Sequence, residues 1–198
     1  MAEMQMMSKT VSAIEPQKHN KNRYSVFLNG EYAFSLDDET LVKSKIKTGC
    51  ELSDEDVRYL SEEAEFASCK DAGMKLLSRK RYTCSELSKK LAEKGFSVAD
   101  EVCGRFCELG LLDDEEYARA FVHDAAVVSG KGERLIKSEL KRKGIADSII
   151  NSLFDEFDNS DALFSLVEKK FRRKTPDRKT AASVFAACMR KGYQAIHL

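Results

Sequence analysis

The segment IKSELKRKGI at residues 136–145 recurs in altered form as LSKKLAEKGF at residues 87–96 and as VFAACMRKGY at residues 184–193. In each copy, apolar or cysteine side chains lie eight and four positions before the glycine. Residues four apart share one face of a helix, and glycine readily adopts the left-handed backbone that ends a helix. Each copy therefore predicts the end of an amphipathic helix. The glycines are 49 and 48 residues apart, which predicts a structural repeat.

This spacing divides most of the chain into three units of up to three helices each. A long helix and the first unit occupy residues 53–112, the second unit residues 113–158, and a third, basic unit residues 159–198. Ser53 and Asp56 form a capping pattern before the long helix, and the third unit stops six residues after its glycine, so we expect it to be truncated. Tandem three-helix repeats of this length predict a mainly α protein, a curved and elongated solenoid.

Residues 1–52 show a different pattern, typical of strands. Asn29-Gly30 separates the alternating runs 23–28 and 31–36, and this dipeptide favours a tight hairpin turn. Residues 10–15 form a further short candidate strand, and Asp37 or Asp38 can begin a short helix. We expect a small N-terminal hairpin or sheet, with strands confined to residues 10–36.

Composition limits the class of protein. The 198 residues are 42% hydrophobic and 33% charged, which excludes disordered and fibrous proteins. No apolar run reaches the length of a membrane span, and no signal peptide is recognisable. The six cysteines form no CxxC pair, so we expect a reduced, cytoplasmic protein.

The charges are segregated although the net charge is zero. Residues 1–66, 67–112, 113–158 and 159–198 carry net charges of −5, +3, −4 and +6. The basic runs are candidates for contact with a phosphate backbone or an acidic protein surface, and helical geometry predicts that Lys169, Arg172 and Arg173 lie near one face. The partner- or DNA-binding candidates are Arg79, Lys80, Arg81, Lys169, Lys170, Arg172, Arg173, Lys174, Arg178 and Lys179.

Other clusters do not predict catalysis. A metal-dependent nuclease or phosphatase could use the four carboxylates of residues 113–116, but the first turn of a helix prefers Asp and Glu, and we favour the helix. His19, His123 and His197 lack a second ligand at metal spacing, and Cys103 and Cys107 are expected to be packing residues. No catalytic, metal-binding or cofactor-binding residue is assigned.

The order and spacing of several motifs resemble the RecX family of regulatory proteins over nearly the whole chain. The motifs are NKNRY at residues 20–24, VFLNGEYAF at 26–34, AE at 64–65, the stretch 76–91, KGF at 94–96, LGLLDDEEYA at 109–118 and KGI at 143–145. The third repeat departs from the family pattern, because its end is truncated and Cys188 replaces an apolar residue.

The resemblance implies a modulator of the RecA recombinase that is not an enzyme. Family members lie in the groove of the RecA filament on single-stranded DNA and modulate, mostly by inhibition, its ATP hydrolysis and strand exchange. It also implies a role in DNA repair and the SOS response, without a cofactor, for a protein that we expect to be monomeric. Two alternatives stay open: a DNA-binding protein without a recombinase partner, and a metal-dependent nuclease that uses Asp113 to Glu116.

Overall fold

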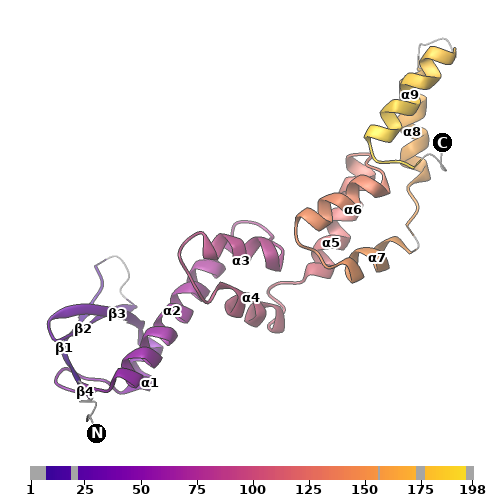
Figure 1. Ribbon diagram of the computed structural model, residues 1–198. Coiled ribbons are helices and arrows are strands. Elements are labelled where there is room, and N and C mark those ends of the chain that lie inside the picture. The colour runs from indigo at the N-terminus through magenta and orange to yellow at the C-terminus, as the bar shows by residue number, and fades with distance from the viewer. Residues whose placement is uncertain (1–7, 19–21, 156, 173–176, 195–198) are drawn as a thin grey trace, which may run out of the picture. The chain divides into compact units, whose positions relative to one another are not determined.

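The computed structural model describes residues 8–18, 22–155, 157–172 and 177–194 (Figure 1). The chain forms two compact units. The first contains residues 1–79 and 91–102, and the second contains residues 80–90 and 103–198. None of the helices in the described ranges combines the length and the hydropathy that a membrane span requires.

A four-stranded antiparallel sheet forms the N-terminal part of the first unit. Its strands are β1 (Lys9–Pro16), β2 (Arg23–Leu28), β3 (Glu31–Asp37) and β4 (Glu51–Leu52), in the order β3-β2-β1-β4. Asn29 and Gly30 have φ values of 51° and 88°, as the predicted hairpin turn requires. The expectation that strands are confined to residues 10–36 is wrong. The pairing of Lys9 and Thr10 with β4 adds an edge strand of two residues, too short to show an alternating pattern.

Helix α1 (Asp38–Ser44) connects β3 to β4 in the first unit, and helix α2 (Asp54–Leu77) follows β4. Helix α1 begins where the Asp37 side chain accepts a hydrogen bond from Thr40 N at 2.7 Å. Helix α2 begins at the capping box predicted from Ser53 and Asp56. Leu60 and Ala64 of α2 are buried together with one face of the sheet; the other buried members of this core are Val11, Val26, Leu28, Phe34, Leu36 and Leu52.

The remaining elements are helical, as predicted for the chain after residue 53. They are α3 (Cys84–Ala92), α4 (Ala99–Glu108), α5 (Asp114–His123), the π-helical turn η1 (Asp124–Val128), α6 (Glu133–Arg142), α7 (Asp147–Phe154), α8 (Ser160–Phe171) and α9 (Arg178–Arg190). The described part of the third repeat contains α8 and α9.

The three predicted helix ends have the same geometry. Gly95, Gly144 and Gly192 have φ values of 93°, 80° and 90°. The amide after each glycine donates to the carbonyl five residues earlier, for example from Ile145 N to Leu140 O at 3.2 Å. This is the Schellman arrangement. It confirms the helix ends on which the repeat prediction depends.

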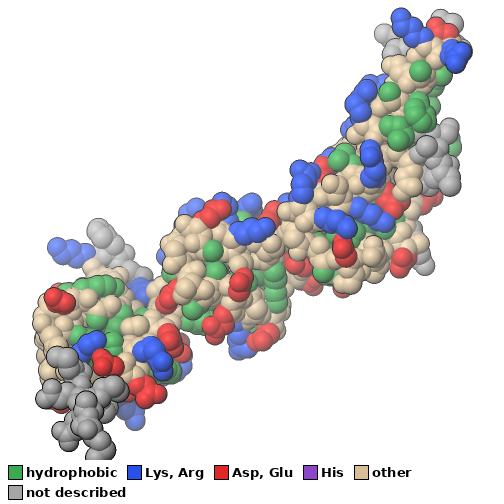
Figure 2. Space-filling model, viewed as in Figure 1, with side chains coloured by type: hydrophobic (Ala, Val, Ile, Leu, Met, Phe, Trp, Pro, Cys, Tyr) green, Lys and Arg blue, Asp and Glu red, His purple; other side chains and the backbone are tan. Residues whose placement is uncertain are grey.

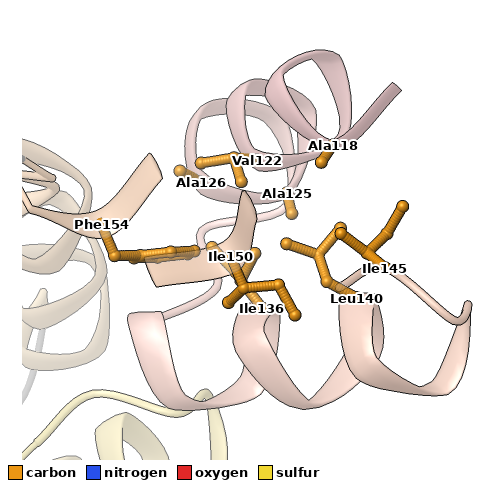
Figure 3. Packing of buried hydrophobic residues seen from close by; sticks show 9 residues of the cluster. All are labelled: Ala118, Val122, Ala125, Ala126, Ile136, Leu140, Ile145, Ile150 and Phe154. Carbon is orange, nitrogen blue, oxygen red and sulfur yellow. The ribbon is translucent and has the colours of Figure 1, made fainter. Parts of the chain in front are cut away.

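The second repeat encloses its own hydrophobic core, which Figure 3 shows from close by. Side chains of α5, η1, α6 and α7 point toward one another, and Leu140, Ile136 and Ile150 are fully buried. The other buried members are Ala118, Val122, Ala125, Ala126, Ile145 and Phe154. The apolar positions predicted to face inward in this repeat are therefore confirmed.

Close contacts join the third repeat to the second within the second unit. Gly132, at the start of α6, donates from its amide to Lys191 O at 2.7 Å, and Arg134 N donates to Gly192 O at 3.1 Å. A Cβ atom on Gly132 would lie 2.4 Å from the Gly192 carbonyl carbon. Only glycine allows the two backbones to approach this closely.

Candidate functional site

The ten basic candidates divide into two groups. Arg79, Lys80 and Arg81 follow α2, and Lys169, Lys170, Arg172, Arg178 and Lys179 lie at the end of α8 and the start of α9. Arg173 and Lys174 lie outside the described residues.

Arg79 lies at a cationic pocket in the first unit, which we call the basic pocket. Its charged lining residues are Arg23, Asp71, Lys75, Arg79 and Lys94, and it encloses about 240 Å³. Four cations and one carboxylate therefore surround one depression. Such a surface is suited to an anionic group such as a phosphate.

Arg23 is held in place by its neighbours and has a structural role in this pocket. Its guanidinium donates to Ser68 Oγ at 2.6 Å and to Ser35 O at 3.0 Å, and it lies 3.9 Å from the Asp71 carboxylate. By contrast, Lys75, Arg79 and Lys94 are exposed and form no ion pair within the described part of the chain. These three cations are available to a ligand.

Lys80 and Arg81 have partners in the second unit. The Lys80 ammonium lies 4.2 Å from the centre of the Tyr82 ring, and Arg81 forms an ion pair with Glu116 at 3.4 Å. Both members of that ion pair are well exposed, so it contributes little to stability. The three cations predicted to act together therefore have different surroundings: Arg79 lines the basic pocket, whereas Lys80 and Arg81 contact side chains of the second unit.

The five basic candidates of the third repeat that the structure describes are all exposed. Lys169 and Lys170 lie in the last turn of α8, where cations favour the negative end of the helix dipole. Arg172 is the residue that ends α8, and its N–H still donates to Glu168 O, while Arg173 of the predicted common face lies outside the described residues.

The first turn of α9, unlike the last turn of α8, carries cations at the positive end of its helix dipole. Arg178 and Lys179 occupy this turn, which contains no acidic residue, although positive charge is unfavourable there. Asp177 caps the helix by accepting a hydrogen bond from Thr180 N at 2.6 Å. Hydrogen bonds with the backbone and side chain of Thr180 hold the pKa of the Asp177 carboxyl below its usual range. Helix stability therefore does not explain the two cations.

The carboxylates of residues 113–116 begin α5, as the helical interpretation predicted. Asp113 accepts from Glu116 N at 2.8 Å, and Glu115 pairs with Arg119 at 2.6 Å. Asp114 accepts from Cys84 N at 2.8 Å, and burial raises the pKa of this carboxyl. Across the described ranges, no group of three potential ligands is arranged to hold a metal ion.

The cysteines differ in part from expectation. Cys84 and Cys107 are joined as a disulfide, so the expectation of reduced cysteines is wrong for this pair. Cys107 is also exposed rather than packed. Cys103 and Cys69 are buried outside any disulfide, and burial raises the pKa of the Cys69 thiol to about 11. A thiol with so high a pKa is unreactive at neutral pH.

Sequence reasoning missed Lys75 and Lys94 as members of a basic surface. Lys75 lies in the last turn of α2, and Arg79 follows the helix four residues later, the spacing at which side chains share a helix face. That spacing was a usable signal. Lys94 comes from the turn after α3, and no spacing in the sequence predicts that it lies beside α2.

Comparison with known protein families gives three matches along the chain. The model described as "Regulatory protein RecX N-terminal domain" matches residues 9–53. The model "RecX, first three-helix domain" matches residues 69–106, and "RecX, second three-helix domain" matches residues 113–152.

Individual proteins agree with these matches. A "Regulatory protein RecX" of Clostridium perfringens strain 13 is 32% identical over 192 residues, covering 92% of this chain and 90% of the relative. One of Bacillus licheniformis is 30% identical over 190 residues, covering 92% of this chain and 72% of the relative. A "Crystal structure of regulatory protein RecX" aligns with a TM-score of 0.74 and 27% identity over 96% of both chains.

Proposed function

The chain belongs to the RecX family of regulatory proteins, and we propose that it regulates homologous recombination by binding the RecA filament on single-stranded DNA. In this proposal, binding inhibits ATP hydrolysis and strand exchange by the filament. The observation that carries it is the 32% identity to a regulatory protein RecX over 92% of the chain.

The distribution of charge supports a partner of this kind. The exposed cations of the basic pocket and of α8 and α9 are suited to phosphates or acidic protein surfaces. The RecX family is a family of regulatory proteins rather than of enzymes, and we propose that this chain likewise acts without catalysis, in the cytoplasm, as a monomer, within DNA repair and the SOS response.

A titration tests the proposal. The chain is added to RecA of the same organism on circular single-stranded DNA, and ATP hydrolysis and strand exchange are measured. We expect both to fall as the chain is added. The proposal fails if both rates stay unchanged while the chain is folded and in molar excess over RecA.

The basic pocket favours a second candidate, a DNA-binding protein without a recombinase partner. This candidate predicts tight binding to bare single-stranded DNA that weakens steeply with salt, together with unchanged ATP hydrolysis by the filament. Measuring both in the same buffers separates the two candidates. The third candidate, a metal-dependent nuclease, has less support because Asp113 and Asp114 accept backbone hydrogen bonds at a helix start.

A further inference from the structure

An apolar groove lies between α8 and α9 in the third repeat. It encloses about 510 Å³, and its lining includes Val167, Phe171, Ala181, Ala182 and Phe185, with Arg178 among them. Figure 2 shows hydrophobic side chains gathered over these two helices, with basic side chains nearby. The groove is therefore an apolar surface within a basic part of the protein.

Each wall of the groove is a helical stripe. On α8, Val167 and Phe171 line the groove at helical spacing, and Phe164, one turn before Val167, extends this stripe and is 71% exposed. On α9, Phe185 is 47% exposed beside the small side chains of Ala181 and Ala182. Large exposed aromatic residues beside small ones leave space for apolar side chains of another helix.

In the second repeat, another helix covers the position that corresponds to Phe185. Aligning Gly144 with Gly192 places Phe185 at the position of Lys137 in α6. The Lys137 ammonium lies 4.8 Å from the centre of the Phe154 ring, and Phe154 belongs to α7, which packs on α6. In the third repeat, no element of the described ranges covers Phe185.

The charges beside the groove indicate the character of an element that would fit it. Lys170, Arg172, Arg178 and Lys179 are exposed at the ends of α8 and α9 that meet at the groove. Helix α7 is apolar on one side, and the sequence from residue 145 to residue 158 contains four acidic residues. An element of the same kind would bury the apolar stripes and place its carboxylates beside these cations.

We propose that the groove between α8 and α9 binds an acidic amphipathic helix supplied by a partner protein, in the manner in which α7 covers α6. The apolar stripes supply the contact area, and the flanking cations select acidic helices. This inference does not rest on the proposed function, because its test contains no recombinase.

The probe is a labelled synthetic peptide with the sequence of residues 145–158, and fluorescence anisotropy measures its binding to the full chain. We expect saturable binding to the wild type and about tenfold weaker binding to Phe185→Ser, because an aromatic anchor is lost. Ala182→Glu, at an exposed helical position, should weaken binding similarly by repelling the acidic peptide. Val128→Ser, at an apolar position of the second repeat that is 78% exposed, is the matched control and should bind as the wild type does.

A scrambled peptide of the same composition shows whether binding requires the amphipathic pattern of the peptide or only its net charge. Equal binding of the scrambled peptide, or unchanged binding to folded Phe185→Ser and Ala182→Glu, overturns the proposal. Sedimentation of the wild type and of Phe185→Ser tests whether a second copy of the chain occupies the groove instead. Self-association that depends on Phe185 would assign the groove to a second copy of the chain and would also overturn the proposal. Circular dichroism establishes that each variant is folded.

Discussion

The lysine before each repeat glycine shows how one local pattern acquires different roles. Lys143 donates to Glu86 Oε1 and to Tyr117 Oη, both at 2.9 Å, and its carbonyl accepts from Thr83 Oγ1 at 2.7 Å. Lys94 lines the basic pocket, and Lys191 donates to Ser129 O at 2.8 Å. The sequence predicts that all three lysines lie at a helix end. It does not predict their partners, which come from segments distant along the chain.

Replacing Lys143 by methionine should therefore destabilise the protein. The variant leaves the partly buried Glu86 and Tyr117 without their donor, and we expect the free energy of unfolding to fall by about 1–3 kcal/mol. Urea denaturation measures this loss. Lys94→Met is the matched control, since it removes the same charge from the same helix position and should cost less than about 0.5 kcal/mol. Equal losses in both variants would show that the contacts of Lys143 contribute nothing.

The pH dependence of this loss has a defined sign. Burial disfavours the charge on Lys143, but the hydrogen bonds to Tyr117 and Glu86 outweigh it and raise the pKa of the ammonium. A raised pKa means that the stabilisation is complete below the unfolded value of about 10.4 and is lost as pH rises through the folded value. The difference between wild type and Lys143→Met should stay constant from about pH 6 to 9 and shrink above that range.

A substitution at Asp114 tests whether its carboxyl has a structural role or a catalytic one. Burial raises the pKa of its carboxyl, so Asp114→Asn removes an unfavourable charge while keeping an oxygen to accept from Cys84 N. We expect the free energy of unfolding at neutral pH to stay equal or rise by less than about 1 kcal/mol. Because the folded pKa is the higher one, any gain should shrink as pH falls through it and vanish below about pH 3.9.

The same variant tests the nuclease alternative. Incubation of wild type and Asp114→Asn with Mg²⁺ and single-stranded DNA should leave the DNA intact in both cases. Cleavage by the wild type that Asp114→Asn abolishes would assign the carboxylates of residues 113–116 to catalysis and contradict their role as helix-starting residues.

At the scale of elements, the predictions succeeded where a local signal determines the structure. Ser53 with Asp56, Asn29-Gly30 and the three glycine helix ends each specify a backbone conformation within a few residues. The edge strand β4 was missed because its two residues pair with Lys9 and Thr10, about 40 residues away. No local sequence pattern marks the π-helical turn η1, because α5 continues into it without a break.

The joint between the second and third repeats depends on Gly132. A methyl group there would lie 2.4 Å from the Gly192 carbonyl carbon and from Tyr193 N, which are backbone atoms that cannot rotate away. Gly132→Ala should therefore lower the free energy of unfolding by about 1–3 kcal/mol and speed hydrogen exchange in α8 and α9. Hydrogen exchange with mass spectrometry locates the effect.

Gly104→Ala is the matched control for that substitution. Gly104 lies in α4 with open space around its Cα, so the methyl group should stabilise the helix by up to about 1 kcal/mol. Unchanged exchange in α8 and α9 of Gly132→Ala would mean that the third repeat does not depend on this close approach.

At the scale of the whole molecule, charge segregation was predictable from the sequence, but the grouping of the cations was not. Block charges identified the first and third repeats as basic. The fold then brought Lys94 to Lys75 and Arg79, while it paired Arg81 with Glu116. Spacing within one helix predicts neighbours, whereas contacts between segments depend on tertiary packing.

Two triple variants distinguish the basic surfaces. The first replaces Lys75, Arg79 and Lys94 by alanine, and the second replaces Lys169, Lys170 and Arg172. All six residues are exposed, so thermal unfolding should change little in either variant. Binding to bare single-stranded DNA is measured at several salt concentrations, and inhibition of filament ATP hydrolysis is measured in parallel.

We expect the first variant to lose the larger share of DNA affinity, because three unpaired cations surround one pocket. Each lost phosphate contact should reduce the salt slope of binding by about 0.7, so the slope should fall by about 2. If the cations of the third repeat contact an acidic protein surface instead, the second variant should keep its DNA binding and lose inhibition of the filament. Unchanged DNA binding and inhibition in the first variant would show that the basic pocket is ordinary solvated surface, and the contact with phosphate would then have to come from the exposed cations of α8 and α9.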